Sequence, residues 1–285
     1  MLRIGLATFT GVPALTADDQ LLAAELRGRD SYVEALVWDD PGVRWAELDA
    51  LVLRSCWDYH QRPAEFLAWM ERLQREGVKV WNPPALVRWN SHKSYLRELE
   101  AAGVAVLPTA WLSRATPTDL HALLEERGWR EAVVKPAVSA SAHGTWRTGL
   151  DRAAEDQPRL DELLSHAEVL VQPLAPEVSR DGEWSFVFLG GEYSHAVLKR
   201  PAAGDFRVQR ELGGSEAALE PPPALLVQAR AVTARIPGSW LYARVDGIDR
   251  GGALTLLELE LIEPVLFLGM EVGAARRFAS AILAA

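Results

Sequence analysis

The pattern of apolar runs changes along this chain, and the change limits the folds that it can adopt. Near the N-terminus, short apolar runs alternate with amphipathic stretches, which predicts strands and helices alternating around a parallel sheet. In the last third, apolar runs follow one another across the glycine turns LGG and DRGG, which predicts antiparallel hairpins. A length of 285 residues suits two or three packed subdomains around one cleft. We therefore expect an α/β unit followed by α+β units.

The first expected unit covers residues 1–88. Its strands are predicted in LRIGLATF, YVEALVW and LDALVLRS, which are short and rich in apolar residues. One helix is predicted over Ala17–Arg27 behind the cap residue Thr16, and another over Pro63–Glu76, where proline suits the first turn.

The second and third expected units cover residues 89–170 and 171–285. In the second, we expect a helix from about Ser91 to Gly103, a strand near 104–112, a helix near 118–128 and the strand AVVKPAV. The stretch SASAHGTWRTG is typical of a mobile loop or hairpin tip. The third unit is expected to hold the strands EVLVQPL, EWSFVFLGG, EYSHAVLKR, LYARVDGID and ALTLLELEL, with helices near 223–236 and 271–283.

Composition narrows the classes of function. The net charge is −9 and no basic block stands out, so we expect no nucleic-acid partner. No apolar run reaches the roughly 18 residues of a membrane span, and the start lacks a secretory signal, so we expect a cytoplasmic protein without a membrane partner. Cys56 is the single cysteine, which excludes an internal disulfide and favours a small buried residue over a nucleophile.

Three carboxylates near the C-terminus are the strongest candidates for a metal site. Glu258 and Glu260 share a strand face because side chains alternate, and the DRGG turn brings Asp246 alongside. Carboxylates that converge in this way repel one another unless cations neutralise them, and Mg²⁺ with bridging phosphate oxygens meets that need. The same alternation of Leu and Glu is also what a half-buried strand with a solvent face shows, so both interpretations stay open here.

Cationic side chains could serve a phosphate group near these carboxylates. Lys135 ends an apolar strand, where it points into a cleft or into solvent. The loop from Ser139 to Gly144 offers hydroxyls and backbone N–H groups, although it lacks a Walker pattern. Further cations, each of which could equally form an ordinary ion pair, are Lys199, Arg207 and Arg244.

The order of these motifs resembles the ATP-grasp superfamily over about residues 80–270. The matching features, in sequence order, are Lys93, Lys135, VQPLAPE, GEWS, Arg207, ARVD and ELELIEP. The glutathione synthetase-like and RimK-like branches are similar, and in particular the ligases that close the ring in cycloserine biosynthesis. The resemblance implies an ATP-grasp fold, with an N-terminal α/β pre-ATP-grasp domain and ATP bound between two α+β subdomains.

The resemblance also implies roles for individual residues. Lys93 and Lys135 would contact the ATP phosphates, and the loop with Ser139, Ser141 and Gly144 would close over them. The remaining implied roles are adenine binding by Gln172 and Leu174, ribose binding by Glu183, nucleotide binding by Lys199, phosphoryl or carboxylate binding by Arg207 and Arg244, and metal binding by Asp246, Glu258 and Glu260. Many relatives carry Asn where Glu260 stands, which affects the expected number of metal ions.

The activity that the resemblance implies is an ATP-dependent carboxylate–amine or carboxylate–thiol ligase that works through an acyl phosphate. The expected cofactors are ATP and two Mg²⁺ ions, for which Mn²⁺ can substitute, and the expected partners are small carboxylate and amine substrates and a second copy in a homodimer. An amino acid, a small peptide or an amino-acid-derived metabolite would be the acceptor. The alternatives are a peptide- or protein-tailoring ligase and a non-catalytic ATP-binding regulatory module.

The segment RSCWDYHQRP is the remaining candidate for substrate binding. Its polar residues Arg54, Asp58, Tyr59 and His60 follow a predicted strand, where they could bind an amino-acid-like substrate. A loop anchored by a buried Trp57 explains the same residues equally well.

Overall fold

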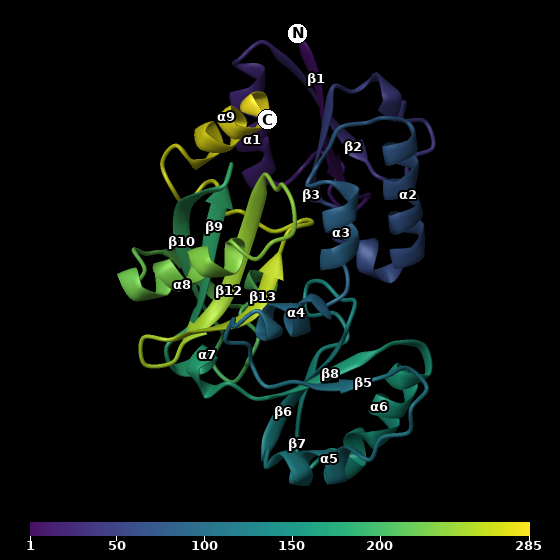
Figure 1. Ribbon diagram of the computed structural model, residues 1–285, viewed down its shortest axis with the longest axis vertical. Coiled ribbons are helices and arrows are strands. Elements are labelled where there is room, and N and C mark those ends of the chain that lie inside the picture. The colour runs from purple at the N-terminus through teal and green to yellow at the C-terminus, as the bar shows by residue number, and fades with distance from the viewer.

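The chain folds around three β-sheets, as Figure 1 shows. The structure is a computed structural model that describes residues 1–285, apart from the side chain of Glu211. One sheet is parallel and the other two are antiparallel, so the predicted order of an α/β unit followed by α+β units is confirmed. None of the helices described is both long and apolar enough to cross a membrane.

The N-terminal sheet is parallel, with strand order β2-β1-β3-β4. Its first helix begins as predicted, because the Thr16 hydroxyl accepts a hydrogen bond from the Asp19 N–H at 3.0 Å. The elements are β1 (Leu2–Thr8), α1 (Ala17–Arg27), β2 (Ser31–Val37), β3 (Ala50–Ser55), α2 (Pro63–Arg75) and β4 (Val80–Trp81), with short 3₁₀ turns at Trp45–Glu47 and Tyr59–Gln61.

The middle sheet is antiparallel, with strand order β5-β8-β6-β7, and α5 and α6 lie against it at the bottom of Figure 1. The sequence boundary expected at residue 170 falls inside β8. The elements are α3 (Pro84–Asn90), α4 (Tyr95–Ala101), β5 (Ala110–Leu112), α5 (Leu120–Arg127), β6 (Glu131–Pro136), β7 (Trp146–Gly149), α6 (Ala153–His166) and β8 (Val169–Pro173).

Two local predictions for this segment hold with shifted boundaries. The helix expected from about Ser91 to Gly103 is present as the shorter α4, which begins later because the Lys93 N–H donates to the Ala137 carbonyl at 2.8 Å instead of continuing a helix. The stretch SASAHGTWRTG, expected as a mobile loop or hairpin tip, joins the antiparallel hairpin of β6 and β7, and its last residues belong to β7, whose Thr148 pairs with Ala132 of β6. Helix α6 was not predicted, and it contains Pro158, which weakens the sequence signal for a helix.

The C-terminal sheet is antiparallel, with strand order β11-β10-β9-β12-β13. Both predicted hairpins are confirmed, β9 with β10 and β12 with β13. The elements are α7 (Pro176–Arg180), β9 (Glu183–Leu189), β10 (Glu192–Arg200), a 3₁₀ turn at Arg210–Leu212, β11 (Ser215–Ala218), α8 (Pro223–Thr233), β12 (Tyr242–Asp249), β13 (Leu254–Glu260) and α9 (Ala274–Ala284).

A shared core joins the C-terminal sheet to the N-terminal unit. Leu22 of α1, Tyr242 of β12 and Phe278 of α9 belong to one buried cluster, and Figure 1 shows α9 beside α1. The Tyr242 hydroxyl lies within hydrogen-bond distance of backbone carbonyls on both sides of this junction, 2.9 Å from that of Leu53 and 2.8 Å from that of Ile262, and its single proton is donated to one of them. The two parts therefore pack as one body.

Side chains from α3 and α4 cover the outer edge of β13. The Asn90 side chain donates to the Leu259 carbonyl at 2.8 Å and accepts from the Leu261 N–H at 2.9 Å. The Tyr95 hydroxyl accepts from the Leu259 N–H at 3.1 Å. These bonds provide partners for backbone N–H and C=O groups at the free edge of β13, and they hold the strand in place.

We predict that Asn90→Ala lowers the free energy of unfolding by about 2 kcal/mol, because it leaves a buried backbone donor and a buried acceptor without partners. Urea unfolding of the variant and the wild type measures this difference. Ser113→Ala, which removes an exposed hydroxyl, is the matched control and should change stability little. If Asn90→Ala lowers the free energy of unfolding no more than the control does, the stability of β13 does not depend on Asn90.

Candidate active site

A cavity of about 300 Å³ lies between the middle and C-terminal sheets, with further walls from the N-terminal unit. Apart from Gly144, all the residues that the resemblance implies for nucleotide, phosphoryl and metal binding line it. The lining members of that set are Lys93, Lys135, Ser139, Ser141, Gln172, Leu174, Glu183, Lys199, Arg207, Arg244, Asp246, Glu258 and Glu260. Residues from distant parts of the chain therefore meet in one place.

The β12–β13 hairpin sets the acidic end of the cavity. In its register, Arg244 lies opposite Glu260 and Asp246 lies opposite Glu258, so the predicted approach of Asp246 to the two glutamates is confirmed. Arg244 and Asp246 share one face of β12, and the Arg244 guanidinium donates to the Asp246 carboxylate at 2.9 Å.

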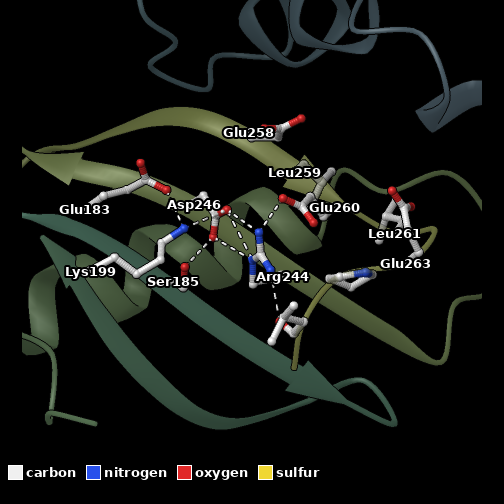
Figure 2. Close-up of polar contacts among 12 residues, drawn as sticks. Glu183, Ser185, Lys199, Arg244, Asp246, Glu258, Leu259, Glu260, Leu261 and Glu263 are labelled. Carbon is white, nitrogen blue, oxygen red and sulfur yellow. Dashed lines mark hydrogen bonds and ion pairs between the residues drawn. The ribbon is translucent and has the colours of Figure 1, made fainter. Parts of the chain in front are cut away.

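Asp246 is the centre of a buried network of polar contacts, shown in Figure 2. Besides Arg244, the Lys199 ammonium lies 3.3 Å from its carboxylate and the Ser185 hydroxyl donates to it at 2.6 Å. Burial opposes the ionisation of Asp246, but Arg244 and Lys199 outweigh it and lower the pKa of this carboxyl to about 2. Asp246 is therefore a fixed negative charge at neutral pH.

The two glutamates on β13 have different partners. The Lys93 ammonium donates to Glu258 at 2.7 Å, and although burial opposes ionisation, Lys93 and Lys135 lower the pKa of Glu258. Glu260 contacts Arg244, yet burial, with the charges of Asp246 and Glu258, raises its pKa to about 7. Glu258 thus keeps its charge near neutral pH, whereas Glu260 is poised between its two forms.

The three cavity lysines differ in how they are paired. Lys93 also donates to the Ser139 carbonyl at 3.0 Å, and Lys199 lies 2.6 Å from Glu183. Among the residues that the structure describes, Lys135 has no hydrogen-bond or ion-pair partner, and burial lowers its pKa to about 8. Lys135 is therefore a cation that an incoming anion can pair with at no loss of an existing contact.

Of the other predicted residues, Gln172, Leu174 and Arg207 line the same cavity as this lysine, and Gly144 does not. The Gln172 amide donates a hydrogen bond to the Thr109 hydroxyl at 2.8 Å, and the Leu174 N–H donates one to the Glu131 carbonyl at 3.0 Å. Arg207 pairs with Asp205 at 2.9 Å. Gly144 lies in the loop between β6 and β7, outside the cavity lining. It has a φ of +67°, and a Cβ there would lie 2.9 Å from Pro136 Cγ, so this loop position requires glycine.

The acidic residues fit Mg²⁺ by the chemistry of their oxygen donors. Among the described residues, however, no group of three or more His, Cys, Asp or Glu side chains is arranged to hold a metal ion, and Asp246, Glu258 and Glu260 are each paired with a lysine or arginine. Mg²⁺ is commonly held by one or two carboxylates together with substrate phosphates, which matches such a site. The metal-binding role of Asp246, Glu258 and Glu260 stays a prediction.

The segment after β3 divides into structural and cavity-lining residues. Arg54 is buried and pairs with Asp19 at 2.7 Å, and Asp58 accepts from the Trp38 indole at 2.8 Å. Tyr59 lines the cavity, whereas His60 packs against His143 with ring centroids 5.0 Å apart. Trp57 also lines the cavity. Cys56 is fully buried, as predicted, and burial raises the pKa of its thiol.

Sequence reasoning missed several polar cavity residues, among them Asn90, Gln209, Arg210, Glu216 and Glu263. Asn90 gave no sequence signal, because its role depends on the edge of a strand far along the chain. Glu263 lies outside the alternation that selected Glu258 and Glu260, since it follows the end of β13. The available signal in the sequence was an acidic residue next to a proline, directly after a strand that contains two glutamates.

Comparisons with known proteins identify relatives of this chain. A family model described as the N-terminal domain of the D-cycloserine synthetase DcsG matches residues 4–82. The cycloserine biosynthesis protein DcsG of Streptomyces lavendulae is 33% identical over 267 residues, which cover 87% of each chain. The glutathione synthetase of Prochlorococcus marinus (strain MIT 9313) is 34% identical over 149 residues, 51% of this chain and 45% of that protein.

Solved structures show the same fold. The crystal structure of D-cycloserine synthetase DcsG matches with a TM-score of 0.88 and 30% identity, covering 98% of each chain. The ATP-grasp ligase PsnB, solved with a minimal precursor, Mg and ADP, matches with a TM-score of 0.66 and 17% identity over 99% of this chain and 96% of that one, a likeness of fold alone. Because the likeness to DcsG extends over most of its length, the chain belongs to the ATP-grasp ligases, in the family of the cycloserine biosynthesis protein DcsG.

Proposed function

We propose that this ATP-dependent ligase transfers the γ-phosphoryl group of ATP to a substrate carboxylate in the described cavity. An amine then attacks the acyl phosphate, the carbonyl carbon–oxygen bond to phosphate breaks, and a C–N bond forms as the amine loses a proton. The substrate is an amino-acid-derived molecule, and the reaction is of the kind for which the relative DcsG is named, D-cycloserine synthesis.

The observation that supports this proposal most is the meeting of an unpaired cation with paired acids in one buried cavity. Lys135 offers its charge to a phosphate group, while Asp246 and Glu258 lie opposite each other on β12 and β13. A triphosphate needs cations for its oxygens and carboxylates for its metal, and this cavity has both.

The chain's own residues would act mainly by binding and orientation. Lys93 and Lys135 would hold phosphate oxygens, and the loop with Ser139 and Ser141 would exclude water from them. Mg²⁺ held by Asp246 and Glu258 would neutralise phosphate charge. Arg244 is fully engaged with Asp246, Glu260 and the Val265 carbonyl, so we assign it to holding the acidic strand pair in register.

The presence of a glutamate at position 260 is best explained by its partner, Arg244. Because Arg244 lies directly opposite Glu260 and contacts it, a carboxylate at this position balances a buried guanidinium. We infer that the main role of the Glu260 carboxylate is to pair with Arg244, and that binding a metal ion is its secondary role. The same intact set of acids and cations argues against the alternative of a non-catalytic regulatory module.

We predict that Glu258→Gln lowers ADP release by at least about 100-fold, because it removes a charge from the proposed metal site. Release is measured with ATP, Mg²⁺ and a panel of amino acids, with thermal melting as the check on folding. Glu192→Gln, an exposed change of the same charge, is the control and should keep full activity. Wild-type turnover in a folded Glu258→Gln protein would contradict the assignment.

We also predict that binding of a non-hydrolysable ATP analogue weakens as pH rises through about 8. Burial lowers the pKa of Lys135 to about 8, so its positive charge is present below that pH and is lost above it. Lys135→Arg keeps its charge throughout and should remove most of this dependence. Titrations between about pH 6.5 and 9.5 test this, and equal slopes for both proteins would show that Lys135 does not bind the phosphates.

A further inference from the structure

The loop that joins β6 to β7, residues 139–145, touches both the cavity and the N-terminal unit, and we call it the lid loop. Ser139 and Thr145 line the cavity. At the same time, Ala140 packs against a hydrophobic core formed mainly by the N-terminal unit. The Lys93 ammonium donates to the Ser139 carbonyl at 3.0 Å. The position of the lid loop is therefore set by contacts with other parts of the chain.

The backbone of the lid loop is strained, so its shape depends on those contacts. Ser141 and Ala142 have φ angles of +50° and +55°, a left-handed region that residues with a side chain rarely adopt. Two such residues in succession persist only where the surrounding structure holds them. The loop's own hydrogen bonds form tight turns, from the His143 N–H to the Ala140 carbonyl at 2.9 Å and from the Thr145 N–H to the Ala142 carbonyl at 3.1 Å.

One of the outside contacts is a pair of histidine rings. His143 of the lid loop packs against His60, which lies in the 3₁₀ turn Tyr59–Gln61 after β3 and is partly buried. Their ring centroids are 5.0 Å apart and their planes are inclined by 51°, which is usual for a packed aromatic pair. Neither ring lines the cavity, and the proposed ATP chemistry uses neither. The pair is therefore a contact between the lid loop and the N-terminal unit.

The surroundings of His60 favour its uncharged form. Burial, and after it the charge of His143, lowers the pKa of His60, and Lys93 acts in the same direction. A backbone hydrogen bond at Trp57 and the charge of Asp58 act in the opposite direction without outweighing burial. The Asp58 carboxylate is already engaged in an ion pair at 2.8 Å. A proton on His60 therefore works against the contact with His143.

We propose that His60 is a positioning residue for the ligation reaction, which holds the lid loop on the cavity through His143 and releases it when acid charges the pair. This inference rests on the proposed function and concerns how the same cavity is closed. A histidine outside such a contact has a pKa of about 6.5. Because the docked loop lowers the pKa of His60, the contribution of the pair to docking is complete above that pH and is lost as the pH falls below it.

The first test is hydrogen exchange of the lid-loop amides in the nucleotide-free protein, with variants compared at the same pH. At about pH 7.5, His60→Ala should speed the exchange of residues 139–145 about tenfold relative to wild type. At about pH 5.5, where wild type has lost the contact, the two proteins should exchange alike. His60→Phe keeps a packed ring that cannot take a proton, so it should keep the loop protected at both pH values.

The second test is binding of a non-hydrolysable ATP analogue with Mg²⁺. The affinity of His60→Phe relative to wild type should rise from about one at about pH 7.5 to at least about fivefold at about pH 5.5. Other groups that titrate in this range, Glu260 among them, act in both proteins and cancel in this ratio. His121→Phe, which removes an exposed histidine on α5, is the matched control and should follow wild type at every pH.

A double-mutant comparison shows whether the two rings act through each other. His60→Ala, His143→Ala and the double variant should weaken binding at about pH 7.5 by a similar factor, because each breaks the same contact. The inference is overturned if the double variant loses the sum of the two single losses, if His60→Ala leaves lid-loop exchange unchanged, or if His60→Phe and wild type share one pH dependence. A failure of the proposed function would appear separately, as absent nucleotide binding in wild type at every pH, with lid-loop exchange still following the pattern given above.

Discussion

The balance of charge inside one buried cavity is the constraint on which this structure depends. Placing Glu183, Asp246, Glu258 and Glu260 together away from water is strongly unfavourable unless cations compensate each of them. Lys93, between α3 and α4, does so together with Lys199 of β10 and Arg244 of β12. The register of β12 and β13, the cover of α3 and α4 over β13, and the hairpin of β9 and β10 all serve to bring these pairs together.

The same network explains how the cavity can exchange partners. An arriving nucleotide and its metal would bring both signs of charge, so ion pairs such as Lys93 with Glu258 can be replaced by phosphate and Mg²⁺ without leaving any group alone. Lys135 would be the group at which this exchange begins, because it has no partner among the described side chains.

Local chemistry in the sequence was enough to predict much of the fold and of this site. The cap at Thr16, the turn DRGG and the alternation in LLELELIE predict α1, the β12–β13 hairpin and the approach of Asp246 to Glu258, all of which the structure contains. Contacts between distant segments were not predictable in this way. The break between α3 and α4 depends on a bond from Lys93 to Ala137, and the pairing of Arg244 with Glu260 depends on a strand register. Glu263 was missed because a strand period says nothing about residues beyond the end of the strand.

Calorimetric titration of the wild-type protein with a non-hydrolysable ATP analogue, with and without Mg²⁺, tests the central claim most directly. If the paired carboxylates and the unpaired Lys135 form a nucleotide site, the analogue binds, its affinity rises with Mg²⁺, and Lys135→Ala loses most of that affinity. If a folded, ligand-free sample binds no analogue, or binds it equally well without Mg²⁺ and without Lys135, the cavity does not hold ATP in the way that we propose.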